Sequence, residues 1–309
     1  MVLADFLYVA LGLVILIVAG DALVKGAVNL ALRLGIPALV VSLTVVAFGT
    51  SAPELLVSVQ AILDGAPGLA LGNVVGSNTA NVLLVLGVPA LIATLHTSHC
   101  ETRRDYLYML GASALFIALC LPGALVWWNG LLLLAVLAVI LVATFLASRG
   151  EDAEVEGADD AMAGWKVAAF LILGLVGLPL GANLLVDGAT TIARTFGVSE
   201  AVIGLTLVAI GTSLPELATT VMAAIRRHAD VALGNVIGSN LFNLTAIMGI
   251  AVLVGPVPVE PSFLRVDLWI MLASTLLLIP FVFLRRDITR LWGVGLFGLY
   301  VLYLGKMFV

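Results

Sequence analysis

Charged residues are scarce in this sequence, and their scarcity sets the class of protein. They make up 11% of its 309 residues, whereas soluble globular domains carry roughly 25%. Hydrophobic residues make up 62% and fall in apolar runs that follow one another along the chain. Runs of roughly 20 apolar residues are long enough to cross a bilayer as helices. The sequence therefore predicts an all-α polytopic membrane protein and excludes a soluble core.

Cysteine, histidine and basic clusters are also few. Cys100 and Cys120 lie at opposite ends of one expected helix, which excludes a disulfide between them. His96 and His99, three residues apart, could in principle bind a metal, but we interpret them as solvated surface residues rather than metal ligands. No basic patch supports nucleic-acid binding, no protein partner is indicated, and the lipid bilayer is the partner that the composition implies. The opening MVLADF has no positive charge, so we expect the first apolar run to be a retained helix rather than a cleaved signal peptide.

Two stretches of twelve residues each occur twice. LTVVAFGTSAPE at 43–54 matches LTLVAIGTSLPE at 205–216 in nine of twelve positions, 162 residues apart. ALGNVVGSNTAN at 70–81 matches ALGNVIGSNLFN at 232–243 equally well and at the same offset. Because the register holds across both stretches, the pattern indicates that one unit has been duplicated.

The apolar runs predict ten transmembrane helices, five in each copy. An odd number of helices per copy makes the two copies enter the membrane from opposite sides, as inverted repeats do. We therefore expect a first five-helix repeat at 1–149, an acidic cytoplasmic linker at 150–164 and a second five-helix repeat at 165–309. The expected spans are 4–24, 37–63, 69–94, 105–122, 126–148, 165–186, 200–226, 230–254, 264–284 and 289–308.

The distribution of basic residues predicts the orientation in the cell membrane. Cytoplasmic loops are enriched in Lys and Arg. With both termini extracytoplasmic, eleven of the fourteen basic residues fall on the cytoplasmic side and three outside. The eleven are Lys25, Arg33, Arg103, Arg104, Arg149, Lys166, Arg226, Arg227, Arg285, Arg286 and Arg290, and the three are Arg194, Arg265 and Lys306.

Each copy places a glutamate, Glu54 or Glu216, inside an apolar span, where an ionisable group indicates a functional site. The preceding prolines, Pro53 and Pro215, predict a break in each helix. A break frees backbone carbonyls, which at membrane depth are tolerated only where they line a cavity. Hydroxyl groups beside the breaks add further oxygens. The next helix of each copy adds a Ser and an Asn that lie four residues apart on one face. These residues are Thr50, Ser51, Ser77, Asn81, Thr212, Ser213, Ser239 and Asn243.

The combined set has two carboxylates, hydroxyls, amides and freed carbonyls, with no thiolate or imidazole. Oxygen ligands of this kind suit hard cations, Ca²⁺ or Na⁺, rather than Zn²⁺ or Cu. Small polar residues by themselves can serve only to pack helices together. That structural role does not explain two glutamates repeated in register beside helix breakers. The sequence therefore predicts a cation site.

The motif pair GTSAPE…GNVVGSNTAN and GTSLPE…GNVIGSNLFN resembles the two alpha repeats of the cation/calcium antiporter superfamily, specifically its prokaryotic sodium/calcium exchanger branch. The resemblance covers essentially the whole chain. It implies ten helices, alternating access, no cofactor, and Ca²⁺ and Na⁺ as the transported ions. It also implies that Glu54 and Glu216 are shared central ligands and adds the backbone oxygens of Ala47 and Ala209 to the hydroxyl and amide set. Asn243 departs from archaeal members, which carry Asp at that position.

Three functions are compatible with these residues. Sodium-driven calcium antiport fits best. Calcium/proton or another cation antiport on the same scaffold is the alternative, although proton-coupled relatives usually place an acidic residue where this chain has SN-x-x-N. An intramembrane enzyme would use Glu54 and Glu216 as an acid/base pair, but it would also need a nucleophile and a substrate cleft, so we expect no enzymatic activity.

Overall fold

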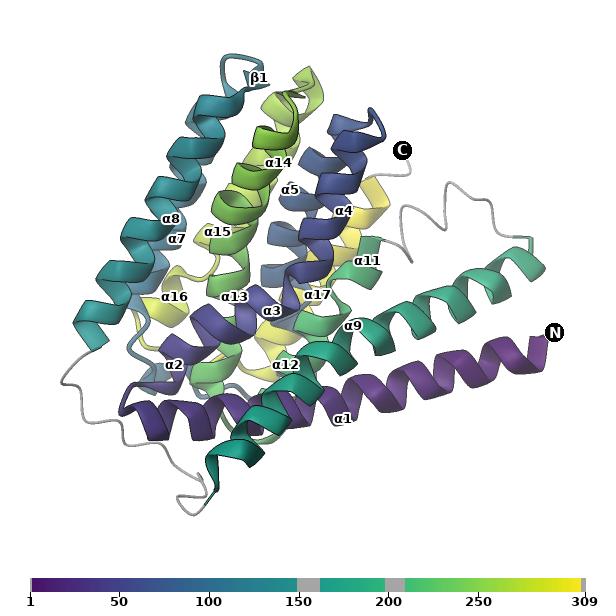
Figure 1. Cartoon of the computed structure of the whole chain (residues 1–309), viewed down its shortest axis with the longest axis vertical. Helices are drawn as coiled ribbons and strands as arrows, with labels where there is room; N and C mark the ends of the chain where they lie inside the picture. Colours follow the sequence, from purple (N-terminus) through teal and green to yellow (C-terminus); the bar gives the residue numbers. More distant parts are fainter. Residues whose placement is uncertain (1, 149–161, 198–208, 307–309) are drawn as a thin grey trace.

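The computed structural model describes residues 2–148, 162–197 and 209–306, and these are mostly helical (Figure 1). The helical elements before the acidic linker are α1 (Val2–Leu34), α2 (Ala38–Val41), the π-helix η1 (Ser42–Val46), α3 (Ala47–Thr50), α4 (Ala52–Leu63), α5 (Pro67–Leu83), α6 (Gly87–Ile92), the 3₁₀ turn η2 (Thr97–His99), α7 (Arg103–Cys120) and α8 (Trp127–Ser148). After the linker come α9 (Gly164–Thr195), α11 (Ala209–Thr212), α12 (Leu214–Ile225), α13 (Ala229–Phe242), the π-helix η4 (Asn243–Ile247), α14 (Met248–Val254), the π-helix η5 (Phe263–Asp267), α15 (Leu268–Leu276), α16 (Ile279–Val282) and α17 (Arg290–Lys306).

Helix length and composition agree with a membrane protein. Among the described residues, six helical segments are long and apolar enough to cross a bilayer, or seven if the bent pair Ala38–Thr50 and Ala52–Leu63 forms one span. The outer segments keep most of their apolar surface exposed, and only 22% of the Gly164–Thr195 window is buried. The segments Pro67–Ile92 and Ala229–Val254, which carry the second repeated stretch, are 78% and 89% buried. The repeated stretch therefore lies at the centre, and lipid-facing helices surround it.

Helices α1 and α9 form a close antiparallel pair that runs at a steep angle to α4, α8 and α14 (Figure 1). Glycine makes the close approach possible. A Cβ at Gly12 would lie 2.7 Å from the carbonyl oxygen of Gly181, and one at Gly174 would lie 2.5 Å from Leu23 Cβ. Both separations are too short for any side chain at these positions.

The ends of this helix pair differ from the sequence prediction. Spans 4–24 and 165–186 were expected, but α1 continues to Leu34 and α9 to Thr195. The charged residues at the expected boundary are paired rather than solvated: Asp21 bonds Arg226 of the neighbouring α12 and also lies 3.0 Å from Lys25. Each helix ends instead just before a glycine with positive φ, Gly35 at +64° and Gly197 at +78°. A residue in that backbone conformation terminates a helix.

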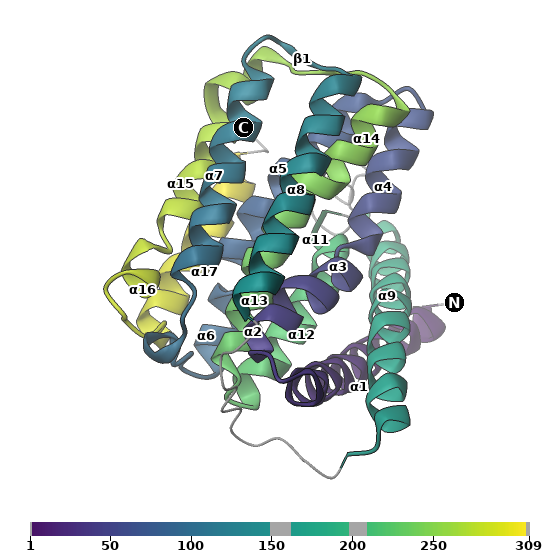
Figure 2. The ribbon, with the colours of Figure 1, turned by 60° about the vertical axis from the view of Figure 1, so that its left-hand side comes forward.

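The two parts of the chain are tied together at both ends of α7. At one end, strand β1 (Ala124–Leu125) pairs antiparallel with β2 (Val257–Pro258), with Ala124 opposite Pro258 (Figure 2). At the other end, the segment before α7 crosses the segment before α17, and Leu95 and Ile288 exchange backbone hydrogen bonds of 3.0 Å.

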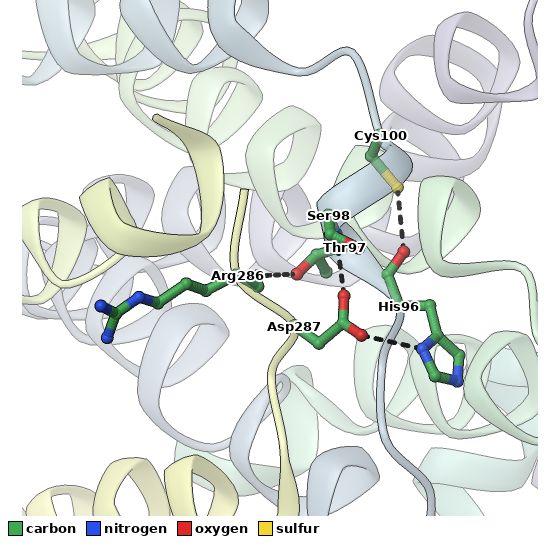
Figure 3. A network of polar contacts seen from close by, with 6 residues as sticks. All are labelled: His96, Thr97, Ser98, Cys100, Arg286 and Asp287. Atoms are coloured by element: carbon green, nitrogen blue, oxygen red, sulfur yellow. Dashed lines mark hydrogen bonds and ion pairs between the residues drawn. The ribbon is translucent and has the colours of Figure 1, made fainter. Parts of the chain in front are cut away.

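Polar side chains reinforce the second crossing (Figure 3). Thr97 Oγ1 donates to the Arg286 carbonyl at 2.7 Å, and the Ser98 backbone N–H donates to Asp287 Oδ1 at 3.0 Å. His96 Nδ1 lies 2.9 Å from Asp287 Oδ2. The interpretation of His96 as a residue of the solvated surface was therefore incomplete, because it joins the two parts of the chain.

Candidate functional site

Both repeated spans break where the glutamates lie. The first bends by 42° between Ala38–Thr50 and Ala52–Leu63, and Ser51 at the break has φ −84° and ψ 5°. The second breaks at Ser213 with φ −85° and ψ 2°, between α11 and α12. Proline in the first turn of α4 and of α12 explains the restart, since its fixed φ suits that position. Both views place α3, α11 and α13 near the middle of the molecule (Figure 1, Figure 2).

Glu54 and Glu216 occupy the first turns of the two restarted helices, and each is 1% exposed. A helix N-terminus favours a negative side chain. Ser51 Oγ, from the first broken span, donates to Glu216 Oε1 at 3.1 Å. The Thr212 side chain, from the second broken span, lies against the Glu54 carboxylate, which also interacts electrostatically with Glu216. Each carboxylate thus meets a hydroxyl from the other copy of the repeat.

Several buried oxygens at this cluster have no hydrogen-bond partner among the residues that the structure describes. They include Oε2 of Glu54, Oε2 of Glu216 and Oγ of Ser213. An unpaired buried carboxylate oxygen is costly, and two such carboxylates together suit a cation. The described residues hold no cluster of three or more His, Cys, Asp or Glu side chains. The donor set therefore fits a hard cation held by oxygen atoms.

Most of the remaining predicted residues are buried. The hydroxyl of Thr50, a residue that is 1% exposed, lies 3.3 Å from both Asn235 Oδ1 and the Ala47 carbonyl oxygen and can donate its one proton to either. The Ala47 carbonyl also accepts the Ser51 N–H at 3.0 Å, so it is not a freed carbonyl in this conformation. Ala209 begins α11 at the edge of the described residues, and the preceding part of its repeat, 205–208, lies outside them. The next helices bury Ser77, Asn81, Ser239 and Asn243 at 5%, 1%, 0% and 1% exposure.

Two further asparagines support the glutamates and were missed by the sequence analysis. Asn73 Nδ2 donates to the Glu54 carbonyl at 3.1 Å and to Ser58 Oγ at 2.9 Å. Asn235 Nδ2 donates in the same way to the Glu216 carbonyl at 3.3 Å and to Thr220 Oγ1 at 3.1 Å. Each amide fixes the backbone of its glutamate against the next helix. Their common place in the repeated ALGN segment was the available signal.

Comparison with known proteins gives the family. The family model described as "Sodium/calcium exchanger protein" matches residues 4–146 and 166–309. The chain is 34% identical to "Sodium/calcium exchanger MaX1" of Methanosarcina acetivorans, covering 100% of this chain and 99% of that protein. It is 35% identical to "Inner membrane protein YrbG" of Escherichia coli, covering 100% and 98%. A solved structure of the sodium–calcium exchanger NCX_Mj, soaked with Na⁺ and Sr²⁺, superimposes with a TM-score of 0.86 at 33% identity, covering 99% of both chains. The chain belongs to the sodium/calcium exchanger family.

Membership confirms several expectations from the sequence. This sodium/calcium exchanger family consists of transporters rather than enzymes, and the transported ions are Na⁺ and Ca²⁺, with no cofactor needed. The chain is an integral multi-pass membrane protein and a cation/calcium antiporter. The resemblance seen in the two repeated motifs is therefore correct.

Proposed function

We propose that this exchanger moves Ca²⁺ against Na⁺ by alternating access, with Glu54 and Glu216 as the central ligands shared by both ions. The observation that carries the proposal is the pair of buried carboxylates, each with one oxygen that accepts no hydrogen bond from the described part of the chain. Two negative charges balance one Ca²⁺, and their oxygens match its preference for hard ligands. A cation at this position removes the cost of burying two carboxylates together.

The proposed site extends symmetrically from the two glutamates. Hydroxyls, amides and backbone oxygens from both repeats would coordinate the flanking sodium ions. The full proposed ligand set is Ala47, Thr50, Ser51, Glu54, Ser77, Asn81, Ala209, Thr212, Ser213, Glu216, Ser239 and Asn243. The bond from Ser51 to Glu216 supports a site built jointly by both repeats.

The proposed architecture is ten transmembrane helices in two inverted five-helix repeats, 1–149 and 165–309, joined by the acidic cytoplasmic linker 150–164. The constant offset of 162 residues supports the duplication. The matching roles of Asn73 and Asn235 add structural support. We further propose that both termini are extracytoplasmic, as the distribution of Lys and Arg favours. The relative named an inner membrane protein supports a location in the cell membrane.

Calcium/proton antiport is the alternative to sodium coupling in this proposal. The relative named a sodium/calcium exchanger and the solved sodium–calcium exchanger structure support sodium. The all-oxygen site supports a hard cation generally. Choosing between the two coupling ions therefore requires a transport measurement.

Purified protein in vesicles, loaded with Na⁺ and diluted into Na⁺-free medium containing ⁴⁵Ca²⁺, tests the choice. We expect calcium uptake that follows the outward Na⁺ gradient and disappears when a sodium ionophore dissipates it. An outward H⁺ gradient at equal Na⁺ on both sides should drive no uptake. Uptake driven by the H⁺ gradient alone would replace this proposal with calcium/proton antiport.

A further inference from the structure

Asn78 and Asn240, which the proposed ligand set leaves out, lie where α5 and α13 pack against each other. They occupy equivalent positions in the two repeats, and each is 1% exposed. Asn81 Nδ2 donates to Asn240 Oδ1 at 3.0 Å, and Asn240 Nδ2 donates to the Asn78 backbone carbonyl at 3.3 Å. A chain of two hydrogen bonds thus passes from α5 to α13 and back.

The backbone carbonyl of Asn78, where this chain of hydrogen bonds ends, fixes the orientation of both amide side chains. A backbone carbonyl only accepts hydrogen bonds, so the NH₂ group of Asn240 must face Asn78. The Oδ1 of Asn240 then faces Asn81, which must present its own NH₂ group. The Oδ1 of Asn81 is consequently turned away from Asn240, and it is buried with no hydrogen-bond partner in the part of the chain that the structure describes. An amide oxygen in that state is available to a hard cation or its water.

The equivalent position in the second repeat is not fixed in this way. Within residues 2–148, 162–197 and 209–306, neither Oδ1 nor Nδ2 of Asn243 has a hydrogen-bond partner. Asn78, which would play the part of Asn240, donates its Nδ2 to the Val74 carbonyl of its own helix at 2.7 Å. Asn81 is therefore held with its oxygen free, whereas the Asn243 amide can present either its oxygen or its NH₂ group.

We propose that Asn240 is a positioning residue that fixes the Asn81 amide with its oxygen toward the ion cluster. Position 81 is then an oxygen ligand at all times, and the two halves of the site bind ions unequally despite their similar sequences. This inference rests on the proposed function, because it assigns Asn81 to the ion site. Residues that orient a metal ligand typically change metal affinity by about 10-fold or more when removed.

The test compares Asn240→Ala with its counterpart Asn78→Ala in purified protein. The measurement is ⁴⁵Ca²⁺ binding at equilibrium and its displacement by Na⁺. Asn240→Ala should raise about 10-fold the Na⁺ concentration that displaces half of the bound ⁴⁵Ca²⁺. Asn78→Ala keeps the backbone oxygen that Asn240 needs, so it should change displacement by less than about twofold. Asn240→Leu, which retains the volume without polar atoms, is a second variant, and melting temperatures report the folding of each protein.

A double-mutant cycle separates positioning from packing. If Asn240 acts through Asn81, adding Asn240→Ala to Asn81→Ala should change displacement by Na⁺ by less than about twofold. If the effects of Asn240→Ala and Asn81→Ala on displacement by Na⁺ multiply in the double variant, the inference is overturned. It is also overturned if Asn78→Ala weakens displacement by Na⁺ as much as Asn240→Ala does. Wild-type protein that binds neither Ca²⁺ nor Na⁺ would remove the proposed function and this inference with it. Wild-type protein that binds both, with Asn240→Ala unchanged, would remove this inference alone.

Discussion

Replacing Gly238 of α13 by alanine should disable the exchanger by separating the two repeats at the ion cluster. The added Cβ would lie 2.4 Å from the Leu43 carbonyl oxygen and 2.7 Å from Ala47 Cβ. An ordinary contact is about 3.4 Å, and none of these neighbours is the end of a flexible side chain, so the helices must separate by about 1 Å. Overpacking of this kind costs about 1–3 kcal/mol of stability.

The displacement matters because the segment that Gly238 touches carries Thr50 and Ser51. The bonds from Thr50 to Asn235 and from Ser51 to Glu216 are already 3.3 and 3.1 Å long. A further separation of about 1 Å exceeds hydrogen-bond length. Both bonds should therefore break, and the ligands should lose their alignment. Misplacement of a reacting group by about 1 Å lowers an enzyme's rate about 100-fold, and we expect a loss of similar order in sodium-driven ⁴⁵Ca²⁺ uptake.

The assay is uptake into vesicles together with the melting temperature of the purified protein. Gly111→Ala in α7 is the matched control, because apart from the adjoining backbone of its own helix no described atom lies within 4 Å of the methyl group it would add. Alanine there should leave uptake unchanged and alter stability by no more than about 1 kcal/mol. Gly238→Ala protein with the uptake and melting temperature of the wild type would refute the packing argument.

Two other predictions concern orientation and the crossing in Figure 3. A cysteine introduced by Ala158→Cys should react with impermeant thiol reagents only from the cytoplasmic side. Reaction from outside in intact cells would reverse the orientation. Burial and the nearby Asp230 and Asp287 raise the pKa of Cys100 to about 12, so this native thiol should contribute little labelling. Burial raises the pKa of Asp287, but the hydrogen bonds from Ser98 and the nearby His96 outweigh burial and hold that pKa below its usual value. Asp287→Asn should therefore lower the free energy of unfolding by about 1 kcal/mol at pH 7. Because the ionised form carries this stabilisation, the difference in melting temperature should shrink as pH falls below about 3.9 and vanish once pH is below the lowered pKa of folded Asp287. A difference independent of pH would contradict the assignment.

The sequence was sufficient to identify a mostly helical membrane protein, because long apolar runs have few other interpretations. It was insufficient for the ends of α1 and α9, which extend beyond the expected spans 4–24 and 165–186. Asp21 is paired with Lys25 on its own helix and with Arg226 on α12. Such pairing lets a charged turn continue a helix, and it depends on a contact between residues 205 positions apart that no local pattern shows.

The two glutamates of the proposed site could be singled out from the sequence, whereas the contacts between the repeats could not. Duplication and helix breakers pointed to Glu54 and Glu216, and the structure buries both together. That Ser51 bonds the glutamate of the other repeat follows from how the two copies pack, which the spacing within one copy does not reveal. Asn240 was overlooked for a related reason. Its role depends on hydrogen bonds to the opposite helix rather than on its position along its own.

The most direct test of the central claim is sodium-driven ⁴⁵Ca²⁺ uptake by Glu54→Gln and Glu216→Gln proteins. Each change keeps the size of the side chain and removes one of the two negative charges that balance Ca²⁺. Glu260→Gln, at an exposed position outside the cluster, is the control. We predict uptake at background for both cluster variants, with melting temperatures that show a folded protein, and wild-type uptake for the control. Folded Glu216→Gln protein that takes up calcium at the wild-type rate would contradict the account.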